Sequence, residues 1–211
     1  MKAGLEPGAQ ARLGGCEIDP GHTDLGQSQL TGPTAHALEH NGTVDRSMAL
    51  AQHPEILGTR TLHWPDEAAC AASAARLAAA PGLWPSSFLA LQGPLGAGKT
   101  TFARHLLRSL GVQGRIKSPT FAVLEPYEVA QGAISHFDFY RFGDAREWED
   151  AGFRELFAAP GLKLAEWPDK AAPLLPAADW QVQMEPLDGD AREVTVHAMT
   201  AHGVELLDCL P

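Results

Sequence analysis

A glycine-rich run, GPLGAGKTT at residues 93–101, limits the possible folds of this chain more than any other segment. It matches the pattern G-x-x-x-x-G-K-[ST] at Gly93, Gly98, Lys99 and Thr100. The apolar run SFLALQ at residues 87–92 precedes it, and a helical pattern follows from residue 99 to residue 110. A strand, a glycine-rich loop and a helix in this order are the context that the motif requires, so the sequence predicts a phosphate-binding P-loop.

Each residue type in this run has a physical reason for its place. Glycines allow backbone conformations that aim successive N–H groups at one anion, and the helix that follows adds its positive dipole end. Lys99 can reach the outer phosphates, the Thr100 hydroxyl can ligate magnesium, and Thr101 can hydrogen-bond an inner phosphate. The nucleotide-binding residues expected in this run are Gly93, Gly96, Ala97, Gly98, Lys99, Thr100 and Thr101.

Two acidic residues follow apolar runs further along the chain. Asp138 ends the run ISHFD, and Glu166 follows LKLA. Acids at the carboxyl ends of parallel strands converge on the edge of the sheet where α/β folds bind ligands. Either acid could order a magnesium ion or its water, and either could instead be a solvent-facing acid at a strand end. The presence of a P-loop favours the first interpretation.

Segments typical of strands and helices alternate after residue 56. Expected strands cover residues 61–64, 87–92, 121–129, 133–140, 162–167, 180–185 and 193–199, and expected helices cover 65–80, 99–110 and 147–156. The turn signal Asp188-Gly189-Asp190 joins the last two strands. This order predicts an α/β P-loop NTPase fold. Its central sheet should be mostly parallel and flanked by helices, with an antiparallel C-terminal hairpin at one end.

Residues 1–55 differ in composition from the rest of the chain. They are rich in Gly, Gln, Thr, His and Pro, and their apolar residues follow neither a helical nor a strand period. Such a segment cannot bury enough apolar surface to offset its ordering entropy. Met48 lies just before the patterned sequence, so residues 1–47 could precede the true translation start. We therefore expect a disordered or wrongly assigned extension at 1–55 and one P-loop ATPase domain at 56–211.

Charge and composition narrow the classes of partner. The formal net charge is −10, which would repel a nucleic-acid backbone unless basic residues cluster in space, so a basic protein partner is easier to reconcile than direct tRNA binding. No stretch approaches the roughly eighteen apolar residues of a membrane span, and no secretory signal is evident. Three cysteines without CxxC spacing suit a reducing compartment. We expect a cytoplasmic protein with no membrane contact.

The same sequence bears on the choice of nucleotide. GTPases of one large class read guanine with an [NT]-K-x-D element. The single asparagine, Asn41, is followed by glycine, and no lysine follows a threonine. Guanine recognition of that kind is excluded, so we expect ATP.

Four segments together resemble one family. GPLGAGKTTFAR, KSPTFAVLEPY, HFDFYR and LAEWP, in this order and at these spacings, resemble TsaE (YjeE). This family consists of small bacterial ATPases required for making threonylcarbamoyladenosine on tRNA. The resemblance extends from about residue 57 to the carboxyl terminus. It implies that the chain binds Mg²⁺ and ATP, hydrolyses ATP slowly, and acts with the TsaB–TsaD complex, meeting tRNA only through that complex.

The resemblance also implies roles for particular residues. Lys99 and Asp138 would be catalytic, with Asp138 ordering the metal's water or the attacking water. Magnesium would be held by Thr100 and Glu166. Glu67 and Trp167 would lie near the nucleotide base, and Arg192 would reach the nucleotide from the late hairpin. The implied switch-like segment facing the γ-phosphate is Ser118-Pro119-Thr120.

Taken without the family, several of these residues have simpler interpretations. Ser118-Pro119-Thr120 is typical of a turn, and Trp167 is typical of packing. His136 fits a buried strand histidine better than a catalytic base. Arg141 could serve as an arginine finger or, more simply, pair with the acids at 144–150. Two other functions also remain open: a small-molecule kinase and a non-catalytic, nucleotide-gated adaptor.

Overall fold

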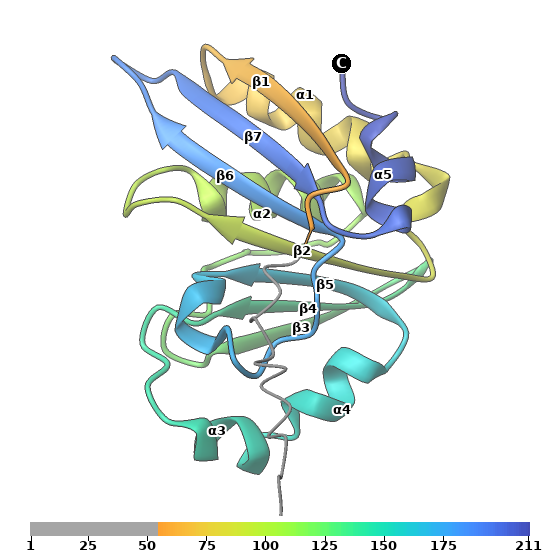
Figure 1. The fold of residues 1–211 in the computed structure, drawn as a ribbon, viewed down its shortest axis with the longest axis vertical. Helices are drawn as coiled ribbons and strands as arrows, with labels where there is room; N and C mark the ends of the chain where they lie inside the picture. The colour runs from red at the N-terminus through yellow and green to blue at the C-terminus, as the bar shows by residue number, and fades with distance from the viewer. Residues whose placement is uncertain (1–54) are drawn as a thin grey trace, which may run out of the picture. The chain divides into compact units, whose positions relative to one another are not determined.

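The computed structural model describes residues 55–211, in which seven strands form one sheet in the order β1-β7-β6-β2-β5-β4-β3 (Figure 1). The strands are β1 (Gly58–Trp64), β2 (Ser86–Gln92), β3 (Leu124–Val129), β4 (Gly132–Asp138), β5 (Gly161–Glu166), β6 (Trp180–Pro186) and β7 (Arg192–Ala198). Apart from Glu55, the predicted extension at 1–55 and its Met48 start lie outside the described residues.

The centre of the sheet is parallel and its two sides are antiparallel. Strands β6, β2, β5 and β4 run parallel to one another, whereas β7 pairs antiparallel with β6 and β1, and β3 pairs antiparallel with β4. This arrangement confirms the predicted α/β P-loop NTPase fold with its antiparallel β6–β7 hairpin. The hairpin is not at the edge, however, because β1 pairs with the outer side of β7. Sequence periodicity cannot reveal such long-range pairing.

Helices cover both faces of the sheet. The α-helices are α1 (Glu67–Ala78), α2 (Lys99–Ser109), α3 (Ala145–Asp150), α4 (Phe153–Ala158) and α5 (Ala201–Leu207), and two 3₁₀ helices are η1 (Pro81–Leu83) and η2 (Pro168–Ala171). Helices α1, α2 and α5 share a core with one face, and α3 and α4 share an aromatic core with the other. None of the helices in residues 55–211 has the length and apolar composition needed to cross a bilayer.

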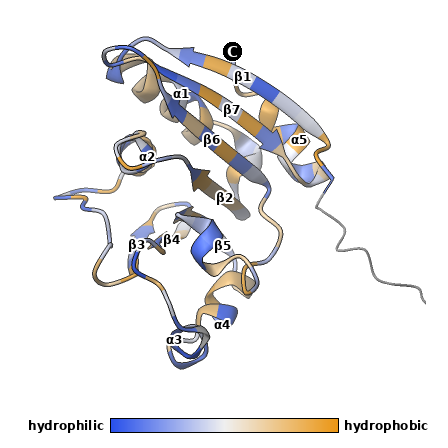
Figure 2. Cartoon of the chain, turned by 60° about the vertical axis from the view of Figure 1, so that its left-hand side comes forward, coloured by the Kyte–Doolittle hydropathy of each residue, from blue (hydrophilic) through white to orange (hydrophobic). Residues whose placement is uncertain are grey.

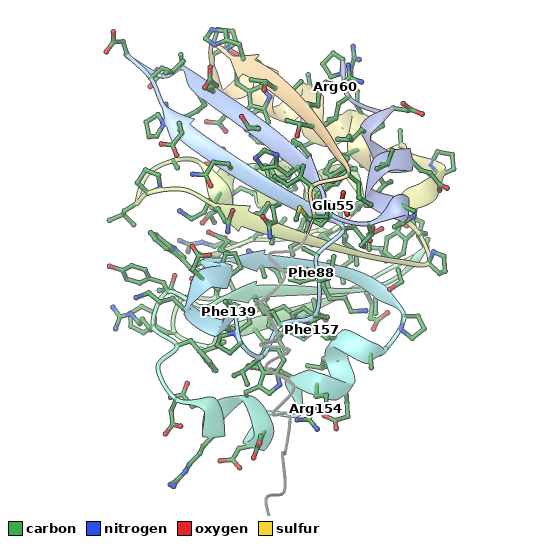
Figure 3. All side chains as sticks on the ribbon, viewed as in Figure 1. Glu55, Arg60, Phe88, Phe139, Arg154 and Phe157 are labelled. Atoms are coloured by element: carbon green, nitrogen blue, oxygen red, sulfur yellow. The ribbon has the colours of Figure 1, made fainter. Side chains whose placement is uncertain are left out.

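The two cores differ in their side chains. Aliphatic residues such as Leu89 and Leu106 dominate the first, whereas Phe88, Phe139 and Phe157 gather in the second, as the labelled sticks in Figure 3 show. Strand β2 contributes to both cores, and Figure 2 colours it hydrophobic along most of its length, whereas β7 alternates. A strand buried on both faces is typical of the centre of a parallel sheet.

Three local predictions were wrong. Residues 147–156 form no single helix, because Gly152 adopts a left-handed conformation (φ +65°) and separates α3 from α4. The strand expected to begin at residue 121 begins at Leu124, since residues 120–122 form a turn. Helix α5 was not predicted, although Thr200 caps its first turn by accepting a hydrogen bond from Gly203 N.

Candidate nucleotide and metal site

Residues 93–98 connect the carboxyl end of β2 to the start of α2. Gly93 (φ +133°) passes so close to β6 that a Cβ there would lie 2.3 Å from the Met184 carbonyl oxygen. Gly98 (φ +109°) precedes Lys99 in a left-handed conformation that side chains rarely adopt. Glycine is therefore required at Gly93 by both space and backbone angle, and at Gly98 by backbone angle alone. The loop places the N-terminus of α2 at the edge where β2, β5 and β4 end.

Lys99 is buried and turned toward its own loop. Its Nζ donates hydrogen bonds to the carbonyl oxygens of Gly93 (2.7 Å) and Pro94 (2.8 Å), and lies 3.9 Å from the ring centroid of Trp167. Burial lowers the pKa of Lys99 below the ordinary lysine value, and the nearby carboxylates of Glu166 and Asp138 oppose that shift. The ammonium group is thus held by neutral acceptors and a ring face, ready to exchange them for an anion.

Glu166 links the P-loop helix to the end of β5. Its Oε2 accepts a hydrogen bond of 2.7 Å from the Thr100 hydroxyl, and its Oε1 lies 2.9 Å from Nε2 of His136. Asp138 is the register partner of Glu166 on the neighbouring strand, so the two carboxylates lie side by side. Both side chains are buried, and neither is the solvent-facing acid that the sequence left open.

Asp138 ties the segment 118–120 to the end of β4. Its Oδ2 accepts hydrogen bonds from the hydroxyls of Ser118 and Thr120 (2.7 Å for Thr120), and its Oδ1 accepts from the Tyr140 backbone N–H at 3.0 Å. These donors compensate the carboxylate for its loss of water. The predicted switch-like residues therefore contact the predicted catalytic acid directly.

Two hollows adjoin this network and share Gly96, Gly98 and Thr101 as a common wall. The first, here called the phosphate hollow, has a volume of about 310 Å³. It is lined by Leu95, Gly96, Gly98, Lys99, Thr100, Thr101, Ser118, Thr120, Asp138, Tyr140, Glu166 and Trp167. The second, here called the base hollow, has a volume of about 230 Å³. It is lined by Trp64, Asp66, Glu67, Cys70, Gly96, Ala97, Gly98, Thr101, Asp190 and Arg192.

The base hollow is built from α1, the P-loop and the start of β7. Arg192 donates from Nε to the Ala97 carbonyl (3.1 Å) and from Nη2 to the Gly96 carbonyl (3.3 Å). Glu67 Oε1 lies within hydrogen-bond distance, 2.9 Å, of Nε2 of His105. Burial, with a smaller contribution from Glu67, raises the pKa of the Cys70 thiol to about 12, so that thiol stays protonated.

Trp167 and Glu67, which the family resemblance places near the base, line two different hollows that share a wall. Trp167 lines the phosphate hollow, where its ring packs against Tyr140 (5.1 Å between centroids) and over Lys99. It adopts a left-handed backbone conformation (φ +57°), as does Val123 (φ +64°), whose carbonyl accepts from Asp138 N. Backbone strain of this kind clusters at functional sites. Trp167 lines the phosphate hollow, and Val123 contacts Asp138, which also lines it.

The donor set fits magnesium rather than a metal that the protein holds alone. Within residues 55–211, no group of three or more His, Cys, Asp or Glu side chains could hold a metal ion. Mg²⁺ usually takes one or two protein oxygens together with phosphates and waters. The hydroxyl of Thr100 and the carboxylate of Glu166, joined at 2.7 Å, supply oxygens of that kind.

Three further findings concern Arg141, His136 and a third hollow. The guanidinium of Arg141 lies 4.3 Å from the ring centroid of the exposed Phe121, and among the described residues it forms no ion pair with the acids at 144–150. His136 is fully buried, as expected for a strand histidine. Its contact with Glu166 was missed, and the only available signal was the spacing of two residues from Asp138. A larger hollow of about 380 Å³ lies by Phe88 and shares no residue with either site hollow.

A parallel sheet with a glycine loop and helix N-terminus at its carboxyl edge defines the P-loop NTPase class of α/β proteins. The family described as "Threonylcarbamoyl adenosine biosynthesis protein TsaE" matches residues 64–194. The chain therefore belongs to the TsaE family, which takes part in tRNA threonylcarbamoyladenosine biosynthesis.

Individual relatives agree with this assignment. The tRNA threonylcarbamoyladenosine biosynthesis protein TsaE of Haemophilus influenzae is 42% identical over 117 residues, which cover 56% of this chain and 73% of the relative. The Bacillus subtilis protein of the same name is 36% identical over 115 residues, 54% of this chain and 72% of the relative. The crystal structure of Bacillus subtilis YdiB superposes with a TM-score of 0.59 at 26% identity, covering 72% of this chain and 93% of that one.

Proposed function

We propose that this chain binds ATP with Mg²⁺ and hydrolyses it slowly, as a component of tRNA threonylcarbamoyladenosine synthesis. The observation that carries the proposal is the phosphate hollow. There Lys99, Thr100, Asp138 and Glu166 come from three separate elements and meet at the N-terminus of α2. Buried charges that converge beside a helix N-terminus are suited to a triphosphate.

Binding uses groups that already face the hollow. The loop N–H groups other than Pro94, which has none, and the dipole of α2 attract the phosphates. Lys99 exchanges its two carbonyl acceptors for phosphate oxygens. Thr100 and Glu166 would hold Mg²⁺, which supplies positive charge next to the outer phosphates. The base side would extend into the base hollow, where Arg192 and Glu67 lie.

Hydrolysis requires a positioned water. Asp138 can orient that water with its carboxylate when Ser118 or Thr120 turns its hydroxyl toward the γ-phosphate. No strong general base stands out among the residues that line the phosphate hollow. Catalysis then rests on positioning and on charge stabilisation by Lys99 and the loop amides, so we expect slow turnover alone and faster turnover with partners.

The biological context of the proposal comes from the family. Relatives are named for tRNA threonylcarbamoyladenosine biosynthesis. We infer that this chain acts in the cytoplasm with the TsaB–TsaD complex and meets tRNA only through it. The net charge of −10 agrees with an indirect role, because such a surface repels a phosphate backbone.

Calorimetry and phosphate release test this function. Wild-type protein should bind Mg-ATP and not Mg-GTP, and it should release phosphate faster when TsaB and TsaD are added. Lys99→Ala and Glu166→Ala should abolish release, whereas Lys170→Ala, which removes an exposed lysine, should leave it unchanged. Binding without release in the presence of partners would instead support a nucleotide-gated adaptor. Transfer of the γ-phosphoryl to a metabolite would support a kinase, and no binding at millimolar Mg-ATP would end the proposal.

A further inference from the structure

His136 is a buried polar side chain that the proposed chemistry does not use directly. It lies in the middle of β4 with no exposed surface, and it contacts the site only through Glu166. Its Nε2 lies 2.9 Å from Glu166 Oε1, while its Nδ1 has no hydrogen-bond partner within the part of the chain that the structure describes. Buried polar atoms without partners are rare, so this one calls for a reason.

The hydrogen on the imidazole can be assigned from its partners. A carboxylate oxygen can only accept, so Nε2 must carry the hydrogen that joins His136 to Glu166. His136 therefore donates one hydrogen bond to Glu166 through Nε2.

Strand register explains why this donor reaches that carboxylate. His136 is paired with Leu164, and Asp138 is paired with Glu166. The histidine therefore lies two residues before Asp138 on β4, and its side chain is on the same face of the sheet as the two acids and α2. Glu166 thus divides its two oxygens between opposite neighbours. Oε1 accepts from His136, and Oε2 accepts from Thr100 at 2.7 Å. The two hydrogen bonds together select one rotamer of Glu166.

We propose that His136 is a positioning residue, which orients Glu166 so that its carboxylate and the Thr100 hydroxyl face a magnesium ion together. The inference rests on the proposed function. An aliphatic or aromatic residue would fill the same buried space without an unpaired nitrogen, so packing alone does not account for a histidine here. Donors that orient a ligating carboxylate raise metal affinity, and removing one typically costs about 10- to 100-fold in that affinity.

The test measures how ATP binding by the full chain depends on Mg²⁺. His136→Leu removes the donor, His136→Asn carries an amide too short to reach Glu166, and His136→Gln carries the same amide one carbon further. Leu and Asn should each raise the Mg²⁺ concentration for half-maximal ATP binding about 10- to 100-fold, and Gln should stay within about threefold of wild type. Affinity for ATP in EDTA should be unchanged in all three. Ile134→Val, on the same strand and face, should lower only the thermal midpoint.

Each outcome decides the question. If His136→Leu does not fold, the Asn and Gln variants still differ in the one contact at issue. An unchanged Mg²⁺ requirement in His136→Asn overturns the inference, as does an equal loss of ATP affinity with and without Mg²⁺, which would mean a purely structural role. If wild-type protein shows no Mg²⁺-dependent ATP binding, the proposed function is wrong, and this inference, which rests on it, is wrong as well. Normal wild-type binding beside unaltered variants removes this inference alone.

Discussion

The phosphate hollow and the base hollow share a wall but are built in different ways. In the phosphate hollow, the charged groups Lys99, Asp138 and Glu166 are only 4%, 3% and 2% exposed, and each makes at least two polar contacts. In the base hollow, the Glu67 side chain is 68% exposed and has one partner, His105.

The contrast agrees with the proposed function, in which the phosphate hollow carries out the chemistry and the base hollow holds one end of the nucleotide. Charges act more strongly where water is excluded, so groups that stabilise a transferring phosphoryl benefit from burial, provided that hydrogen bonds compensate their lost hydration. Exposed ion pairs contribute little, about 0–1 kcal/mol, and suit a region that only holds one end of a ligand. Perturbations should therefore be large in the phosphate hollow and small in the base hollow.

Replacing Asp138 by Asn should give the largest effect. The change keeps the size of the side chain and removes the charge that orients water, so phosphate release should fall about 100-fold while ATP affinity stays within about threefold. Single-turnover phosphate release and calorimetry would measure the two quantities. Asp150→Asn, at an exposed position of α3, is the matched control. An unaltered rate would mean that Asp138 serves only to anchor residues 118–120.

Raising the pH should weaken ATP binding at a lower pH than an ordinary lysine would allow. Burial lowers the pKa of Lys99 in the free protein, whereas a bound triphosphate favours its ammonium form. Binding then takes up a proton once the pH exceeds the free-protein pKa, and affinity falls by up to about tenfold per pH unit above it. Full affinity is retained below that pKa. Titrations from about pH 7 to about pH 10 should show this fall, and Lys99→Arg, which stays charged, should not.

Arg192→Ala tests the residue of the base hollow that makes the most contacts with the P-loop. Its guanidinium donates to two P-loop carbonyls, so its loss should lower ATP affinity about tenfold, or about 1.4 kcal/mol, with no change in the rate of phosphate release at saturation. ADP affinity should fall equally, because the contact lies away from the γ-phosphate. Arg60→Ala, at an exposed position of β1, controls for the lost charge. A selective loss of rate would contradict the assignment.

Glu67→Gln should give the smallest effect. The side chain is mostly exposed, and an exposed contact such as the one with His105 contributes about 0–1 kcal/mol, so ATP affinity should change by about fivefold or less. His105→Gln should reproduce that change. A loss of ATP affinity larger than tenfold in Glu67→Gln, measured by calorimetry, would contradict the expected difference in sensitivity between the two hollows.

Much of the site could be predicted because its parts are local in sequence. The strand, loop and helix from Ser86 to Ser109 follow from one motif, and the placement of Asp138 and Glu166 follows from strand ends meeting at one edge of a parallel sheet. What could not be predicted depends on contacts between distant residues. The placement of Trp167 and Glu67 in different hollows, the position of Arg141 over the Phe121 ring and the outer position of β1 are of this kind.

The sequence by itself therefore determined the class of the protein, because glycine spacing, apolar periodicity and strand-end acids are local properties that are written along the chain. Tertiary structure decided how those acids are held. Only strand register brings His136 within 2.9 Å of Glu166, and only the return of β7 beside the P-loop brings Arg192 to the carbonyls of Gly96 and Ala97. The strand register and the position of β7 both depend on packing over the whole sheet. No short stretch of residues specifies that packing.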